Sequence, residues 1–196
     1  MEYSKYQILK RITNNINLIW KETRGIAPKC VTDKMENAML GWLVDLTNAL
    51  QIWIDKGEEM TEGELILARA NMGSIVEGWL KIFYCAYYDE YLKNPRKNKR
   101  GGLIEPNKMT LESLKIFSIG ILWDDNEDSN YLWVEKVQHY RNAIHAFDYR
   151  DIGTNLEFIE DIDILYDFVE NIQYRLPPLE DCIECYPAGY IINPYF

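Results

Sequence analysis

The chain has 196 residues, of which 47% are hydrophobic and 13% aromatic, and a formal net charge of −10. This length suits one well-packed core, and the aromatic content argues against disorder over most of the chain. The negative charge disfavours nonspecific nucleic-acid binding, while the lack of a secretory signal or of a roughly 18–20-residue apolar run predicts a cytoplasmic protein with no membrane partner.

Apolar residues recur at helical spacing nearly throughout the chain. The first predicted helix includes residues 6–19. Asp33 and Glu36 have the spacing of a capping box, which predicts the start of a second helix with Met39 and Trp42 on its buried face. The first part of the chain is therefore expected to pack as helices.

A long third helix is predicted from Thr61, whose spacing to Glu64 repeats the capping pattern, to Pro95, which cannot continue a helix. Residues 94–108 form the longest predicted loop. Five positive charges fall within eight residues at its start, with no acidic residue among them: Lys93, Arg96, Lys97, Lys99 and Arg100. This basic strip is either a solvated loop or a contact for the phosphates of RNA.

Three further helices are predicted in the second half of the chain. Residues 110–123 favour a short apolar helix, although their central run also suits a strand. A fifth helix is expected over 131–147, with Ile144 and Phe147 facing the core. A capping pattern at Thr154 opens a sixth helix.

The expected architecture is an all-α, up-and-down bundle of about six helices. Residues 1–176 are predicted to form a single helical-bundle domain, and residues 177–196 an extended C-terminal tail. Cys182 and Cys185 in this tail form one CxxC without two further zinc ligands at suitable spacing, so we interpret them as ordinary thiols. The sequence lacks a phosphate-binding glycine loop, HExxH and GxSxG, and we expect no metal and no cofactor.

Polar residues gather on one side of the fifth predicted helix. Arg141 and His145 are four residues apart and should share one helix face, with Gln138 one turn earlier and Asn142 at the border. Arginine matches a phosphate, and histidine exchanges protons near neutral pH. Because RNA carries its own 2′-hydroxyl nucleophile, these two groups suit its cleavage without a metal. The alternative is an ordinary surface arginine and histidine.

A single histidine does not easily act as both acid and base on opposite sides of one phosphate. A two-fold homodimer would bring two copies of Arg141 and His145 into one cleft. The chemistry therefore favours a homodimer.

The segment 140–147, YRNAIHAF, resembles the signature of the HEPN superfamily, small all-α domains of prokaryotic toxin–antitoxin and phage-defence systems. The resemblance implies a metal-independent endoribonuclease that acts as a dimer. In it Arg141 would stabilise the scissile phosphate, His145 would act as general acid or base, and Asn142 would orient the phosphate. An antitoxin-type protein is a further partner that the resemblance implies.

The third predicted helix looks like the early helix of this superfamily that offers an acidic residue toward the arginine. This nominates Glu77, for which an ion pair with Lys81 is the alternative. The usual motif has four to six residues between arginine and histidine, whereas this chain has three. Some members of the superfamily are inactive, so a dimeric scaffold that binds RNA, a nucleotide or a partner protein is the alternative function.

Overall fold

The computed structural model describes residues 4–21, 27–145, 147 and 149–177. Within them the chain forms α-helices and short 3₁₀ helices, with isolated bridges in place of strands. The α-helices are α1 (Lys5–Lys21), α2 (Lys29–Asn37), α3 (Leu40–Lys56), α4 (Glu62–Ala86), α5 (Tyr88–Lys93), α6 (Leu111–Phe117), α7 (Ser129–Arg141) and α8 (Asn155–Tyr174). The 3₁₀ helices are η1 (Gly57–Glu59), η2 (Pro106–Lys108) and η3 (Asn142–His145). The all-α prediction is confirmed.

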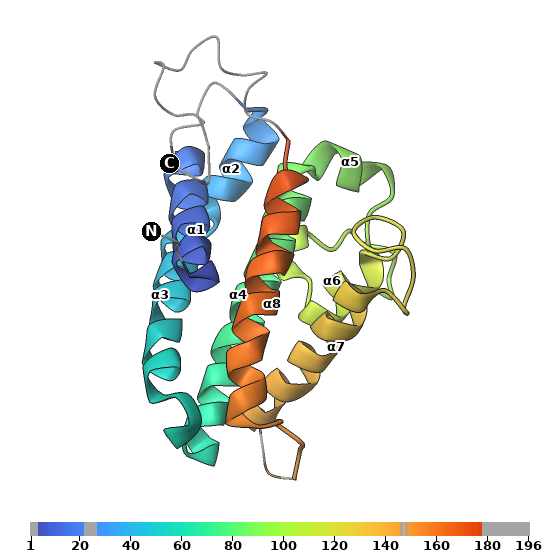
Figure 1. The fold of residues 1–196 in the computed structure, drawn as a ribbon. Helices are drawn as coiled ribbons and strands as arrows, with labels where there is room; N and C mark the ends of the chain where they lie inside the picture. Colours follow the sequence, from blue (N-terminus) through green and yellow to red (C-terminus); the bar gives the residue numbers. More distant parts are fainter. Residues whose placement is uncertain (1–3, 22–26, 146, 148, 178–196) are drawn as a thin grey trace.

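Helix α4 is the centre of the bundle. It packs against α3, α7 and α8, and α1 closes the other side against α3 and α8. Figure 1 shows α3, α4, α7 and α8 running alternately down and up. Because α4 has neighbours on several sides, its apolar residues cover most of its circumference, and Ile75, Trp79 and Leu80 have no exposed surface. Among the described residues, no helix combines the length and apolarity needed to cross a membrane.

Local capping signals set the starts of the two helices that frame the lower end of the bundle. The Thr61 side chain accepts a hydrogen bond from the Glu64 backbone N–H, and the Glu64 carboxylate accepts one from the Thr61 backbone N–H. Thr154 and Glu157 form the same reciprocal pair at the start of α8. The capping boxes predicted at Thr61 and Thr154 are therefore confirmed, and both satisfy backbone donors that a helix start leaves unpaired.

The second predicted helix is wrong in its start and its register. Helix α2 begins directly after Pro28, five residues before the predicted cap at Asp33. Ala38 then adopts extended backbone, with φ −76° and ψ 133°, and separates α2 from α3. The break turns the next helix, so that Met39 and Trp42 are 56% and 64% exposed instead of buried.

The predicted third and fourth helices are each shorter than expected. Helix α4 ends at Ala86, and the separate short helix α5 completes the predicted span. Helix α6 stops at Phe117 because the chain turns through Gly120, whose φ of +77° favours glycine. The breaks at Ala38 and after Ala86 each divide one predicted helix into two, so the described residues form eight α-helices where about six were predicted.

The fifth predicted helix ends six residues early. Helix α7 stops at Arg141, and the tighter helix η3 covers Asn142–His145. Ile144 is consequently 43% exposed and Phe147 fully exposed, whereas both were expected to face the core. The predicted tail, including Cys182 and Cys185, lies outside the described residues from position 178 onward.

Candidate functional site

Arg141 lies directly against the backbone of α4. A Cβ atom added at Gly73 would come within 2.7 Å of the Arg141 Cδ atom and 2.8 Å of its Cβ and Cγ atoms. Real side-chain contacts do not reach such distances, so the arginine stem occupies the space that any other residue at position 73 would need. Gly73 therefore lets α7 place its last residue tightly across the middle of α4.

Glu77 fixes the other end of this side chain. Its Oε2 atom lies 2.8 Å from Nη1 of Arg141, and its Oε1 atom lies 2.6 Å from Nζ of Lys81. The expected approach of Glu77 to the arginine and the alternative pair with Lys81 are thus both present. The Arg141 side chain is 31% exposed and has no other ion pair or hydrogen bond to a described residue. Its remaining guanidinium donors are therefore open to a ligand.

His145 lies on the 3₁₀ helix η3 and not on the α-helix that the expected shared face with Arg141 assumed. Four residues of α-helix turn by about 400°, leaving the two side chains about 40° apart. Four residues of 3₁₀ helix turn by about 480°, leaving them about 120° apart. Because the 3₁₀ helix η3 follows Arg141 directly, we infer the larger separation for these two residues, and His145 is exposed.

The two remaining polar residues of the motif are half-buried. Asn142 caps the C-terminus of α7, and its backbone N–H donates to the carbonyl oxygen of Gln138. Neither side chain makes a hydrogen bond to another described residue. The Asn142 and Gln138 side chains are therefore not committed to a hydrogen bond within the described residues.

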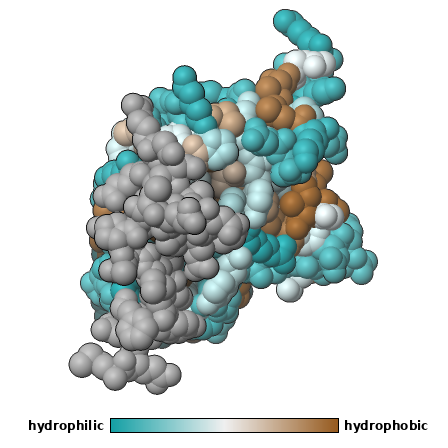
Figure 2. Space-filling view, turned by 90° about the horizontal axis from the view of Figure 1, so that it is seen from above, coloured by the Kyte–Doolittle hydropathy of each residue, from teal (hydrophilic) through white to brown (hydrophobic). Residues whose placement is uncertain are grey.

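The basic strip forms an exposed turn at the other end of the bundle. The Asn98 N–H donates to the Gly102 carbonyl, and the Ile104 N–H donates to that of Arg96. Lys93 pairs with Glu90 at 2.6 Å, whereas no acidic partner among the described residues pairs with the other four cations. Figure 2 views this end of the molecule and shows hydrophilic side chains projecting beside a hydrophobic area.

The basic strip and the arginine motif lie in different parts of the structure. Figure 1 shows α5 and the loop after it near the upper end of α4, while α7 ends toward the lower end. From Gly73 to Ala86 the helix rises by about 20 Å, at 1.5 Å per residue. The structure therefore does not combine the two predicted sets of residues into one surface.

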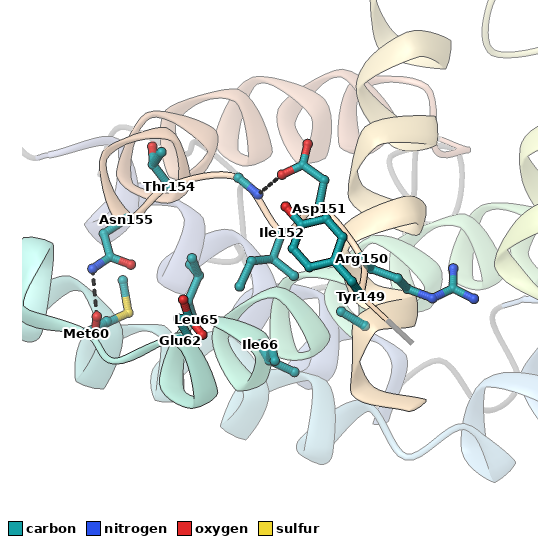
Figure 3. Close-up of a pocket in the computed structure, with 12 residues that line it drawn as sticks. Met60, Glu62, Leu65, Ile66, Tyr149, Arg150, Asp151, Ile152, Thr154 and Asn155 are labelled. Carbon is teal, nitrogen blue, oxygen red and sulfur yellow. Dashed lines mark hydrogen bonds between the residues drawn. The ribbon is translucent and has the colours of Figure 1, made fainter. Parts of the chain in front are cut away.

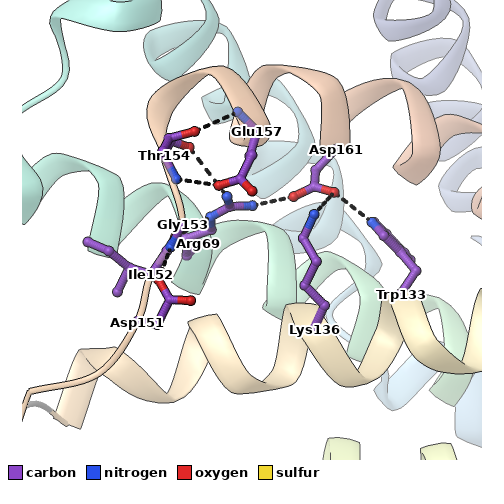
Figure 4. Close-up of polar contacts among 9 residues, drawn as sticks. All are labelled: Arg69, Trp133, Lys136, Asp151, Ile152, Gly153, Thr154, Glu157 and Asp161. Carbon is purple, nitrogen blue, oxygen red and sulfur yellow. Dashed lines mark hydrogen bonds and ion pairs between the residues drawn. The ribbon is translucent and has the colours of Figure 1, made fainter.

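The sequence did not reveal a buried ion-pair network beside the motif. Arg69 forms an ion pair with Asp161, and the two side chains are 1% and 0% exposed, respectively. The other oxygen of Asp161 accepts from the Trp133 indole and the Lys136 ammonium, both at 2.9 Å (Figure 4). A signal existed, because Asp161 lies between Phe158 and Leu165 on the apolar face of α8.

Arg69 also holds the chain that follows the motif. Its Nε atom donates to the Ile152 carbonyl at 3.1 Å, and its guanidinium lies 4.5 Å from the centre of the Tyr140 ring. Burial is the main cause that raises the pKa of Tyr140, with smaller contributions from the carboxylates of Asp151 and Glu157. This part of the structure is therefore anchored to the core.

A pocket of about 470 Å³ opens beside η3, between the first turns of α4 and α8 (Figure 3). Ala143 of η3 forms part of it, so the pocket adjoins the helix that carries His145. Among the described residues, no group of three or more histidine, cysteine or carboxylate side chains could hold a metal ion.

Comparison of the chain with protein-family models, curated proteins and solved structures finds no match.

Proposed function

We propose that this chain is a metal-independent endoribonuclease that works as a cytoplasmic homodimer, similar to HEPN ribonucleases of toxin–antitoxin and phage-defence systems. The observation that carries the proposal is the position of the Arg141 side chain. The arginine is pressed against Gly73, oriented by Glu77, and still partly open to solvent. An arginine of purely structural importance would not need a glycine that admits it and an open side.

The proposed reaction uses the RNA itself as the source of the nucleophile. The 2′-oxygen attacks phosphorus, the bond from phosphorus to the 5′-oxygen breaks, and a 2′,3′-cyclic phosphate forms. One imidazole accepts the 2′-hydroxyl proton, and the other protonates the leaving 5′-oxygen. His145 of each protomer supplies one of these groups, while Arg141 stabilises the charge on the phosphate and Asn142 helps to orient it.

The tighter turn of η3 supports this assignment despite the short motif. On an α-helix a spacing of five residues, the shortest usual in the resembling superfamily, turns by about 140° and rises by about 7.5 Å. Four residues of 3₁₀ helix turn by about 120° and rise by about 8 Å. The helix type therefore offsets the missing residue and gives Arg141 and His145 nearly the usual relation.

The basic strip fits a supporting role in substrate binding. Its four cations without an acidic partner among the described residues would contact RNA phosphates several nucleotides from the point of cleavage, because the strip follows the end of α4, which lies about 20 Å from Gly73. In an otherwise acidic chain, such a local positive area would guide RNA to the protein.

Cleavage of a single-stranded RNA in EDTA tests the proposal, with the oligomeric state measured in parallel. We expect a dimer that cuts, and a loss of about 100-fold or more in rate for His145→Ala. The matched control is His139→Ala, because His139 is the only other histidine of the chain and is also exposed. Undiminished cutting by His145→Ala would contradict the proposal, and RNA binding without cutting would favour the inactive dimeric scaffold.

A further inference from the structure

The pocket beside η3 has walls that are fixed before any ligand arrives. On one side the Asn155 side chain donates to the carbonyl oxygens of Glu58 and Met60, both at 2.8 Å, and ties α8 to the turn before α4. On the other side Gly153 has a φ of +67°, and a Cβ there would come within 3.0 Å of Arg69. The buried arginine therefore supports this wall from behind.

The pocket lining combines apolar and polar residues, and its edge carries an aromatic ring. Leu65 and Ile66 of α4, Ala143 of η3 and Ile152 form the apolar lining. Figure 3 shows the Tyr149 ring beside Ile152 at the edge of the pocket, where a flat ligand could stack on it. Aromatic side chains bind the faces of nucleobases in this way.

Arg150 also lines the pocket, but Figure 3 shows its side chain extending away from the other lining residues. The remaining charged and amide side chains at the rim, those of Glu62, Asp151 and Asn155, offer hydrogen-bond acceptors. The Glu62 carboxylate has no ion pair or hydrogen bond to a described residue. One oxygen of Asp151 accepts from the Gly153 N–H at 2.9 Å, which leaves the other available. The Asn155 amide nitrogen is already used, so that side chain can offer only its oxygen. A ligand of this pocket should therefore be flat and rich in N–H donors.

We infer that the pocket binds the nucleobase next to the cleaved phosphate and prefers guanine, an inference that rests on the proposed ribonuclease function. Ala143, in the pocket wall, is two residues from both Arg141 and His145, so a base bound here would be adjacent to a phosphate at the motif. Guanine presents two neighbouring donors, N1–H and the 2-amino group, which match the two oxygens of one carboxylate. Uracil presents one N–H between two carbonyl oxygens, which the carboxylates would repel.

The negative charge of the pocket indicates that the phosphate of the bound nucleotide lies outside it. Glu62 and Asp151 disfavour a phosphate within the pocket. The Arg150 guanidinium extends away from the other lining residues, so it would attract a phosphate only outside the pocket, as would Arg141 on the neighbouring surface. The base and the phosphate of one nucleotide would thus be recognised by separate groups on the two sides of η3.

Titration of the protein with guanosine and uridine monophosphates, followed by calorimetry or NMR, tests base recognition without cleavage. We expect guanosine monophosphate to bind about tenfold or more tighter, and Glu62→Gln to remove most of this difference. Glu59→Gln is the matched control, because Glu59 is an exposed carboxylate in the neighbouring η1 that does not line the pocket. Equal binding of the two nucleotides, or a preference that survives Glu62→Gln, would overturn the inference.

Mapping the cut positions in a mixed-sequence RNA separates this inference from the proposed function. Cuts beside guanine in the wild type, with cuts scattered among the four bases in Glu62→Gln, support both. Guanine-selective nucleotide binding without any cleavage would support the pocket as a free-nucleotide site and reject the ribonuclease. Cleavage that shows no guanine preference would reject the pocket assignment and leave the ribonuclease standing.

Discussion

Arg69 and Arg141 each pair with a carboxylate of a neighbouring helix, but in opposite surroundings. The Arg69 side chain is 1% exposed, and its partner Asp161 is fully enclosed and also contacts Trp133 and Lys136. The Arg141 side chain is 31% exposed, and among the described residues its one partner is Glu77. The comparison teaches that an enclosed pair holds helices together, whereas an open pair leaves donors for a ligand.

The largest expected effect comes from breaking the enclosed pair. Asp161→Asn removes the negative charge that Arg69 and Lys136 share, and leaves a buried guanidinium uncompensated. Breaking such a buried pair typically costs about 3–5 kcal/mol of folding free energy. Urea unfolding of the variant measures the change, and a loss below about 1 kcal/mol would show that the two arginines do not differ in the way described here.

A substitution at Gly73 tests how tightly Arg141 is seated. Gly73→Ala forces a methyl group against the Arg141 side chain. It should lower the free energy of unfolding by about 1–3 kcal/mol, the usual range for overpacking, and it should also reduce RNA cleavage. Gly63→Ala is the matched control in the same helix, because nothing lies within 4 Å of the added Cβ. That variant should gain up to about 1 kcal/mol, since alanine favours helices over glycine. Equal stabilisation of both variants would mean that the Arg141 side chain moves aside for the added methyl group at little energetic cost.

The smallest effect on stability, and the one most specific to function, is expected at Glu77. Glu77→Gln should change the free energy of unfolding by less than about 1 kcal/mol, because the Arg141 pair is partly exposed. It should nevertheless lower RNA cleavage by about tenfold or more if the carboxylate orients the arginine. Lys81→Met, which removes the other cation from Glu77, should leave cleavage nearly unchanged. Equal losses in the two variants would point to the charge balance of α4 instead of orientation.

The sequence predicted best what neighbouring residues decide among themselves. The caps at Thr61 and Thr154 depend on contacts three residues away, and both helices start where expected. The break at Ala38 has no such local cause, because alanine itself favours a helix. Its extended backbone is instead consistent with the packing of α2 and α3 onto the central α4.

The same division applies to the candidate site. Glu77 was reached through the resemblance, and its contact with Arg141 is present, but spacing alone could not foresee the change from α to 3₁₀ helix after Arg141. The Arg69–Asp161 pair joins residues 92 positions apart, and the pocket needs three separate segments. Such features depend on tertiary packing, which no periodic pattern in the chain encodes.

The most direct test of the account replaces the open arginine itself. Cleavage of a single-stranded RNA in EDTA is compared between the wild type and Arg141→Gln, with urea unfolding as the check that both are folded. If Arg141 stabilises the phosphate during cleavage, the rate should fall by about 100-fold or more while stability changes little. A folded Arg141→Gln variant that cuts RNA at the wild-type rate would contradict the central claim.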